Sequence, residues 1–111
     1  MAKSVYLLTR DLLFRAKLAG VVTEAGGTLT RDADACMLAV VELGASGWEE
    51  RVRELTGRGI PTVAFGPHVD AEPLRRVRAA GATAVPNSQV ESTVRSLLET
   101  QATPGNPGSP T

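Results

Sequence analysis

The sequence feature that most restricts the fold is an apolar run in the first half of the chain. Residues 36–43 read Cys-Met-Leu-Ala-Val-Val-Glu-Leu, and Gly44-Ala45-Ser46-Gly47 follows. A short run of apolar and β-branched residues that ends in turn residues is typical of a strand buried on both faces. Such strands lie in the middle of parallel sheets, where functional residues collect beyond the carboxyl ends of the strands. Glu42, near the end of this run, is therefore the first candidate functional acid.

Four further strands and four helices are predicted around this run. We expect strands over residues 4–8, 28–30, 60–65 and 83–85, and helices over 11–25, 46–56, 70–80 and 88–100. In the first helix, the spacing predicts an inner face of Leu12, Leu13, Ala16, Ala19 and either Val21 or Val22. Ser46 and Ser88 each begin a Ser-x-x-Glu pattern, which predicts that they cap helix N-termini, and Asp70 is expected to cap the third helix.

Residues 31–35 form an unusually short link between the second predicted strand and the buried run. A crossover between parallel strands normally takes a dozen or more residues, including a helix. Here we expect a degenerate helix, a single turn or an extended link. Together these elements predict a doubly wound α/β fold with a five-stranded parallel sheet.

Composition narrows the possible functions. The 111 residues indicate one domain, predicted over 1–100, with a disordered tail over 101–111. Twelve Lys and Arg residues balance twelve Asp and Glu residues, which argues against a dedicated nucleic-acid binder. The one cysteine, Cys36, excludes an internal disulfide and is expected to be a small core residue. No run approaches the ~18 apolar residues of a membrane helix, so we expect a cytoplasmic protein.

Several segments resemble the receiver domain of bacterial two-component response regulators. They are 5–8 (Val-Tyr-Leu-Leu), 38–43 (Leu-Ala-Val-Val-Glu-Leu), 59–65 (Gly-Ile-Pro-Thr-Val-Ala-Phe) and 74–83 (Leu-Arg-Arg-Val-Arg-Ala-Ala-Gly-Ala-Thr). The resemblance covers residues 4–100. It implies a flavodoxin-like fold with strand order 2-1-3-4-5 and Glu42 at the head of the central strand.

The residues that a receiver uses for phosphorylation are different here. A working receiver has acids after the first strand that hold Mg²⁺, and an aspartate after the third strand that accepts the phosphoryl group. It also has a hydroxyl after the fourth strand and a lysine after the fifth, which bind the phosphate oxygens. The resemblance places other residues at these positions: Thr9 and Arg10 beside Asp11, then Glu42, Gly66 and Ser88. Because the fixed cation of Arg10 would repel Mg²⁺, the resemblance implies a pseudo-receiver that is not phosphorylated and is not an enzyme.

Two hypotheses remain open for the carboxyl edge of the sheet. Glu42 either mimics a phosphorylated aspartate or is an ordinary acid paired with Arg10. Alternatively, Asp11, Glu42 and His68 bind a divalent metal, or with Arg10 a small ligand, although Asp11 is an equally good helix N-cap. We expect no cofactor.

A basic face is the last candidate site. Arg75, Arg76 and Arg78 lie close together on the third predicted helix, and Arg95 lies on the last helix. A solvated helix face explains them more simply than nucleic-acid binding does. Receivers commonly pair or bind partners through the fourth helix, fifth strand and fifth helix, which implies a protein contact here, with Ala79, Val85 and Glu91 nearby. We therefore expect a bacterial signalling domain that acts through an unknown protein partner or as a homodimer.

Overall fold

The structure is a computed structural model that describes residues 3–67 and 72–102. Its strands are β1 (Lys3–Leu8), β2 (Gly27–Thr30), β3 (Leu38–Glu42), β4 (Thr62–Gly66) and β5 (Thr83–Pro86). Its α-helices are α1 (Leu12–Glu24), α2 (Trp48–Gly57), α3 (Glu72–Ala79) and α4 (Val90–Ala102). Two 3₁₀ turns complete the order, η1 (Ala33–Ala35) before β3 and η2 (Asn87–Gln89) before α4.

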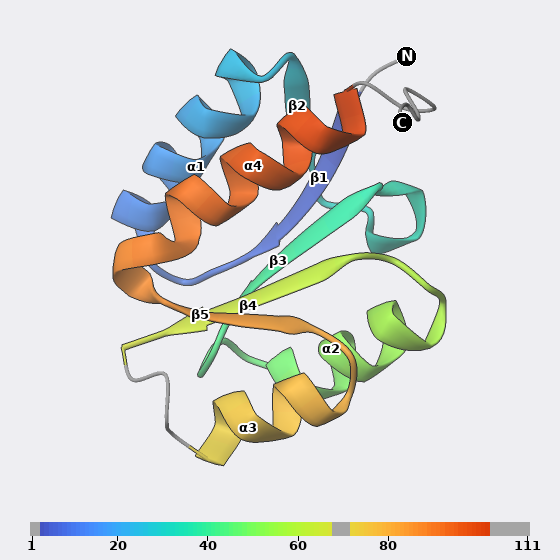
Figure 1. Cartoon of the computed structure of the whole chain (residues 1–111). Coiled ribbons are helices and arrows are strands. Elements are labelled where there is room, and N and C mark those ends of the chain that lie inside the picture. The colour runs from blue at the N-terminus through green and yellow to red at the C-terminus, as the bar shows by residue number, and fades with distance from the viewer. Residues whose placement is uncertain (1–2, 68–71, 103–111) are drawn as a thin grey trace.

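The five strands form one parallel sheet in the order β2-β1-β3-β4-β5. The predicted fold class is therefore confirmed (Figure 1). β3 is central, and its residues Leu38 to Val41 are at most 1% exposed, as the apolar run predicted. Register pairs Val41 with Leu8 of β1 on one side, and Glu42 with Phe65 of β4 on the other. Glu42 thus ends the central strand at the carboxyl edge of the sheet.

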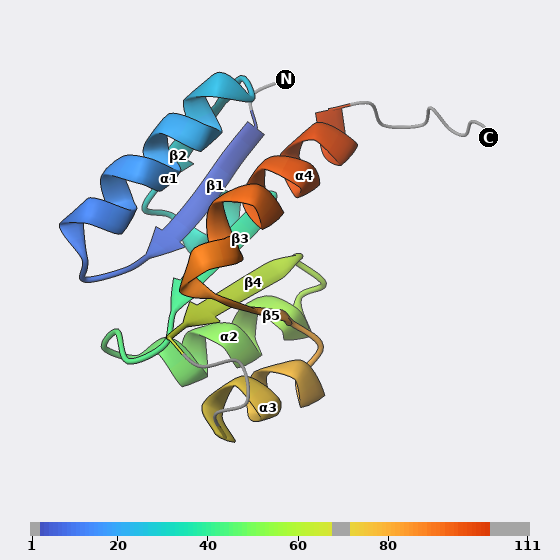
Figure 2. The same cartoon turned by 60° about the vertical axis from the view of Figure 1, so that its left-hand side comes forward.

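The helices cover the sheet on both faces. α1 and α4 lie side by side over one face, and α2 and α3 cover the other (Figure 2). The α1/α4 side contains large aliphatic and aromatic residues, including Leu18, Leu98 and Phe65, whose ring centroid lies 5.1 Å from that of Phe14. The α2/α3 side is built largely from smaller residues, among them Ala39 and Ala64.

The short link between β2 and β3 is the single turn η1, one of the forms the sequence predicted. Asp32 accepts a hydrogen bond from the amide of Asp34 (2.9 Å), and Arg58 from the end of α2 binds the Asp34 carboxylate (2.7 Å). On the same side, the Arg51 guanidinium lies 5.6 Å from the ring centroid of Tyr6. Side chains therefore cover part of the sheet face from which a helix is missing.

The predicted inner face of α1 is wrong at Leu12, Leu13 and Ala16 and confirmed at Val21 and Val22. Leu12 and Leu13 are 80% and 62% exposed, and Ala16 is exposed as well. The buried residues are Leu18, Val21 and Val22, with Phe14 half-buried against the same core. This second stripe also has helical spacing, and its larger side chains fill the space above Phe65.

The predicted capping serines are also wrong. α2 begins after Gly47, which has a left-handed conformation (φ +74°) and makes no side-chain cap, so Ser46 lies outside the cap position. α4 is preceded by η2, which begins after Pro86 without a side-chain cap, so the last helix does not start at Ser88. The cap predicted at Asp70 lies outside the described residues.

Three smaller differences concern element ends and one thiol. β4 begins at Thr62, so Pro61 precedes the strand, where its missing N–H costs no ladder bond. α4 continues to Ala102, two residues into the predicted tail, because Gln101 and Ala102 are good helix formers. Cys36 precedes β3 and is half-buried against the α2/α3 core, and this burial raises the pKa of its thiol.

In the described part of the chain, no helix is long and apolar enough to cross a membrane.

Candidate functional site

Glu42 connects the central strand to the loop after β1. Its Oε1 accepts a hydrogen bond from the Thr9 hydroxyl at 2.5 Å and another from the backbone amide of Arg10 at 3.1 Å. Glu42 is half-buried, and its bond from Thr9 is partly buried, whereas the bond from the Arg10 amide is exposed. The carboxylate therefore fastens the β1–α1 loop directly to the end of β3.

Asp11 belongs to the same loop but has a different role. Its Oδ1 accepts hydrogen bonds from the amides of Leu13 (2.9 Å) and Phe14 (3.3 Å), which makes it the N-cap of α1. Its own amide donates to the Thr9 hydroxyl at 3.1 Å. Thr9 thus connects the Asp11 backbone to the Glu42 carboxylate, and the predicted N-cap is confirmed.

The Arg10 side chain lies over the loop that follows β3. A Cβ placed on Gly44 would lie 3.3 Å from Arg10 Nη2, so the guanidinium covers the backbone of Gly44, where φ is +92°. Arg10 reaches Glu42 through its amide, and no side-chain ion pair joins the two within the described residues. The predicted pairing of their charges is therefore replaced by a backbone hydrogen bond.

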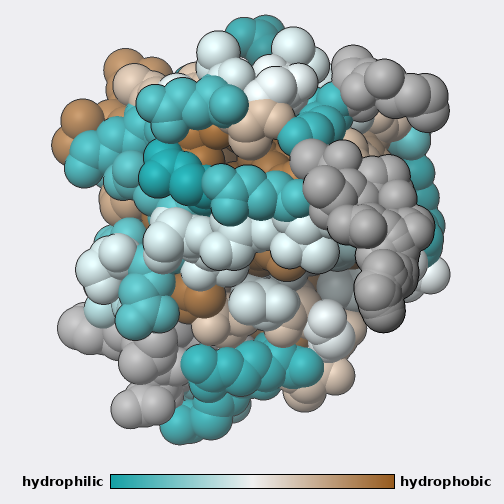
Figure 3. Space-filling model, turned by 45° about the horizontal axis from the view of Figure 1, so that its top comes forward, coloured by the Kyte–Doolittle hydropathy of each residue, from teal (hydrophilic) through white to brown (hydrophobic). Residues whose placement is uncertain are grey.

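A shallow hollow opens above this cluster. It has a volume of about 630 Å³ and is lined by Arg10, Asp11, Leu12, Leu13 and Glu42. In Figure 3 hydrophobic surface stands out at the left-hand edge, the side on which Figure 1 places α1. The exposed Leu12 and Leu13 therefore border the degenerate pocket that sequence reasoning identified.

Neither Gly66 at the end of β4 nor Ser88 after β5 lines the hollow around Glu42. Gly66 is buried, and a Cβ added to it would lie 2.8 Å from Cδ1 of Leu43. Leu43 thus takes the space that a side chain at position 66 would need. Ser88 lies exposed in η2.

The residues predicted to bind a metal form no metal site in the described part of the chain. Across residues 3–67 and 72–102, no group of three His, Cys, Asp or Glu side chains could hold a metal ion. Asp11 caps α1, Glu42 binds Thr9 and the amide of Arg10, and His68 lies outside the described residues.

The arginines of the predicted basic face make separate contacts on different parts of the molecule. Arg76 of α3 pairs with Glu49 of α2 (3.4 Å), whereas Arg95 of α4 pairs with Glu24 of α1 (3.0 Å). These pairs lie on opposite sides of the sheet. Val85 is 7% exposed and belongs to the core, so it is corrected from a contact residue to a packing residue. The remaining members are exposed or half-buried: Arg75, Arg78, Ala79 and Glu91.

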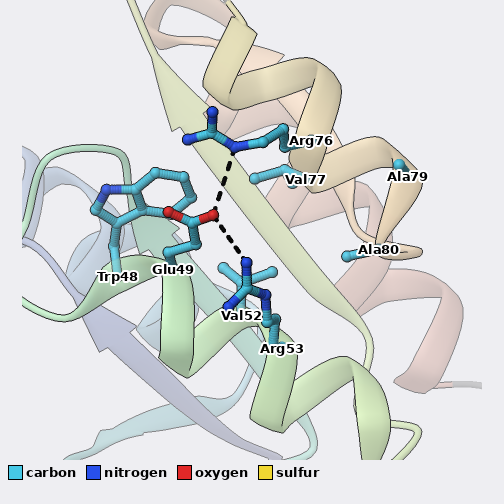
Figure 4. Close-up of a pocket in the computed structure, with 8 residues that line it drawn as sticks. All are labelled: Trp48, Glu49, Val52, Arg53, Arg76, Val77, Ala79 and Ala80. Carbon is cyan, nitrogen blue, oxygen red and sulfur yellow. Dashed lines mark hydrogen bonds and ion pairs between the residues drawn. The ribbon is translucent and has the colours of Figure 1, made fainter.

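Sequence reasoning missed a second hollow, between α2 and α3 (Figure 4). Its volume is about 310 Å³, and its lining residues are Trp48, Glu49, Val52, Arg53, Arg76, Val77, Ala79 and Ala80. A possible signal was the adjacent pair Ala79-Ala80 opposite a tryptophan, since small residues facing a large one leave space. The pairing of the two helices is not visible in the sequence, so the signal could not be interpreted there.

Solved structures similar to this chain include a response regulator receiver protein and NtrX. The receiver protein of Pseudoalteromonas atlantica is 17% identical with a TM-score of 0.71, and the match covers 89% of this chain and 98% of that one. NtrX from Brucella abortus is 16% identical with a TM-score of 0.70, and the match covers 92% of this chain but 28% of NtrX. No family model matches the sequence, and no curated protein does. At these identities the likeness establishes the fold, which is that of a receiver domain.

Proposed function

We propose that this chain is a receiver-like regulatory domain that acts through protein contacts and does not accept a phosphoryl group. The observation that carries the proposal is the hydrogen-bonded link from Glu42 to Thr9 and to the amide of Arg10. It joins the β1–α1 loop to β3 within the protein itself. In a phosphorylated receiver, a metal ion held by acids at the same edge would bridge these two segments.

Two further features support the proposal. Arg10, one of the residues at the metal-binding positions, is a permanent cation, and like charges disfavour a bound Mg²⁺. Leu43 packs against Gly66, at the position where a receiver has the hydroxyl that responds to phosphate. Glu42 acts in this proposal as a constant structural acid, and any state that it stabilises is present without a phosphoryl donor.

The test is incubation of the purified chain with acetyl phosphate and Mg²⁺, followed by intact-mass spectrometry. We expect no phosphoryl adduct, while a phosphorylatable receiver treated in parallel acquires one. The variant Glu42→Asp is the matched control, because it restores the usual acceptor without the metal ligands and is also expected to remain unmodified. A phosphoryl adduct on Glu42 of the natural chain would refute the proposal.

The same proposal includes a protein partner in a bacterial cytoplasmic pathway. A second copy of the chain is one candidate. Light scattering coupled to size-exclusion chromatography distinguishes a dimer from a monomer that needs another protein.

A further inference from the structure

We propose that the hollow between α2 and α3 binds an acidic segment of a partner protein, which inserts one apolar side chain between the two helices. The inference rests on the proposed function, since it names the surface that makes the protein contact. It concerns a different place from the degenerate pocket around Glu42. It shares Arg76 and Ala79 with the basic face that the sequence suggested, but it lies on the side of α3 that faces α2 and includes residues of α2.

The shape of the hollow suits a single apolar anchor. Val52 and Val77, each 2% exposed, and the half-buried Trp48 give it an apolar lining, and Ala79 and Ala80 are too small to fill it. Figure 4 shows Trp48 and Glu49 on the α2 side and Arg76, Val77 and the two alanines on the α3 side. A volume of about 310 Å³ lies at the lower end of the roughly 300–1,000 Å³ range of ligand pockets, which favours one side chain over a large ligand.

The charges at the hollow favour an acidic partner. Glu49 Oε2 lies 3.1 Å from Arg53 Nη2 and 3.4 Å from Arg76 Nε, so one carboxylate serves two guanidinium groups. One positive charge is therefore left over in the lining. The side chains of Arg53 and Arg76 are 68% and 49% exposed, and exposed ion pairs rearrange at little cost. An incoming Asp or Glu can bind either arginine through charge-assisted hydrogen bonds.

The residue types favour a protein over a small molecule. Tryptophan and arginine are the residues that most often dominate binding energy at protein interfaces, around a pocket that an anchor residue fills. The exposed arms of Arg53 and Arg76 form a rim that a small molecule would leave in water. A partner chain continues past its anchor and covers that rim, which strengthens the charged contacts.

Trp48 is the one tryptophan of the chain, so its fluorescence reports directly on the hollow. A displayed library of random linear peptides is selected on the full chain, and the enriched peptides are synthesised and titrated. We expect them to carry a large apolar residue next to Asp or Glu. We also expect a saturable blue shift of Trp48 emission, because the anchor removes water from the indole.

Two variants and two matched controls locate the binding. Arg76→Gln removes the cation and Ala79→Leu fills the hollow, and each should weaken binding at least about tenfold, the loss of one good interface contact. Arg75→Gln and Ala16→Leu make the same exchanges at exposed sites outside the hollow and should bind as the natural chain does. Circular dichroism of all four variants verifies the fold.

Three results would overturn the inference. The first is that the selection enriches no peptide. The second is that the enriched peptides bind Arg76→Gln and Ala79→Leu as tightly as they bind the natural chain. The third is that benzoate, but no peptide, saturates the shift of Trp48 emission. The last result would assign the hollow to a small aromatic anion. The phosphorylation assay is independent: an adduct on Glu42 refutes the proposed function whatever the titration gives, whereas a failed titration of an unmodified chain refutes only the hollow.

Discussion

The two faces of the sheet are packed in different ways. On the α1/α4 face, two helices of 13 residues each cover the sheet, and the buried side chains are mostly leucine, valine and phenylalanine. On the α2/α3 face, the helices have 10 and 8 residues, and alanines take four of the nine buried positions in that core. The first face is closed by large interlocking side chains. The second brings its helices close to the sheet but leaves a hollow between them.

This difference in packing bears on both the stability of the fold and the binding of a partner. Burial of large apolar side chains gives most of the favourable free energy of folding, so the α1/α4 face should dominate the stability of the domain. A face built on alanines contributes less for each residue. It is also the face that carries the hollow with Trp48 and Arg76, where the molecule has room for a partner.

The largest effect is expected for Phe65→Ala, on the α1/α4 face. Phe65 is fully buried and packs against Phe14, so its removal should leave a cavity and lower the free energy of unfolding by about 3–5 kcal/mol. Urea denaturation followed by circular dichroism measures the loss. Phe65→Leu fills more of the space and should lose less. Equal losses for the two variants would mean that the site collapses around any smaller residue, and the contrast between the faces would weaken.

A smaller effect is expected for Ala64→Leu, the next residue in β4 but on the other face. Ala64 is 0% exposed in the α2/α3 core, so added methyl groups have no free space directly above the strand. The free energy of unfolding should fall by about 1–3 kcal/mol, the usual cost of overpacking. Ala79→Leu, at the exposed edge of the hollow, is the control and should cost little. A harmless Ala64→Leu would show that the space between α2 and α3 extends down to the sheet.

The smallest effect is expected at the helix cap on the α1/α4 face. Asp11→Ala removes the acceptor for the amides of Leu13 and Phe14 and should cost about 1 kcal/mol. Asp11→Asn keeps a capping oxygen and should retain most of the stability, as measured by thermal unfolding. If both variants lose the same amount, the negative charge at the end of α1 matters more than the hydrogen bonds.

The regular elements and the centre of the site were predictable from the sequence. Buried strands appear as short apolar runs, and β3 was identified from the run 36–43 that contains it. The position of Glu42 at the carboxyl edge followed from that strand and the parallel sheet. Its hydrogen bonds did not, because Thr9 and Glu42 are 33 residues apart and meet only when β1 and β3 pair.

Local patterns did not identify the buried face where two sets of residues have the same helical spacing. In α1, the stripe beginning at Leu12 and the stripe beginning at Phe14 both recur at helical spacing, and the sequence does not say which stripe faces the sheet. Ser46 satisfied a capping pattern, but the left-handed Gly47 moved the helix start by one residue.

The sequence by itself determined the strands, the helices, their order and the short β2–β3 link, because each depends on neighbouring residues and on chain length. Tertiary structure alone decided the inner face of α1, the bond between Thr9 and Glu42, and the hollow between α2 and α3. Each of these depends on the distance and orientation between elements that are far apart in the chain, and the packing of side chains on the sheet sets both.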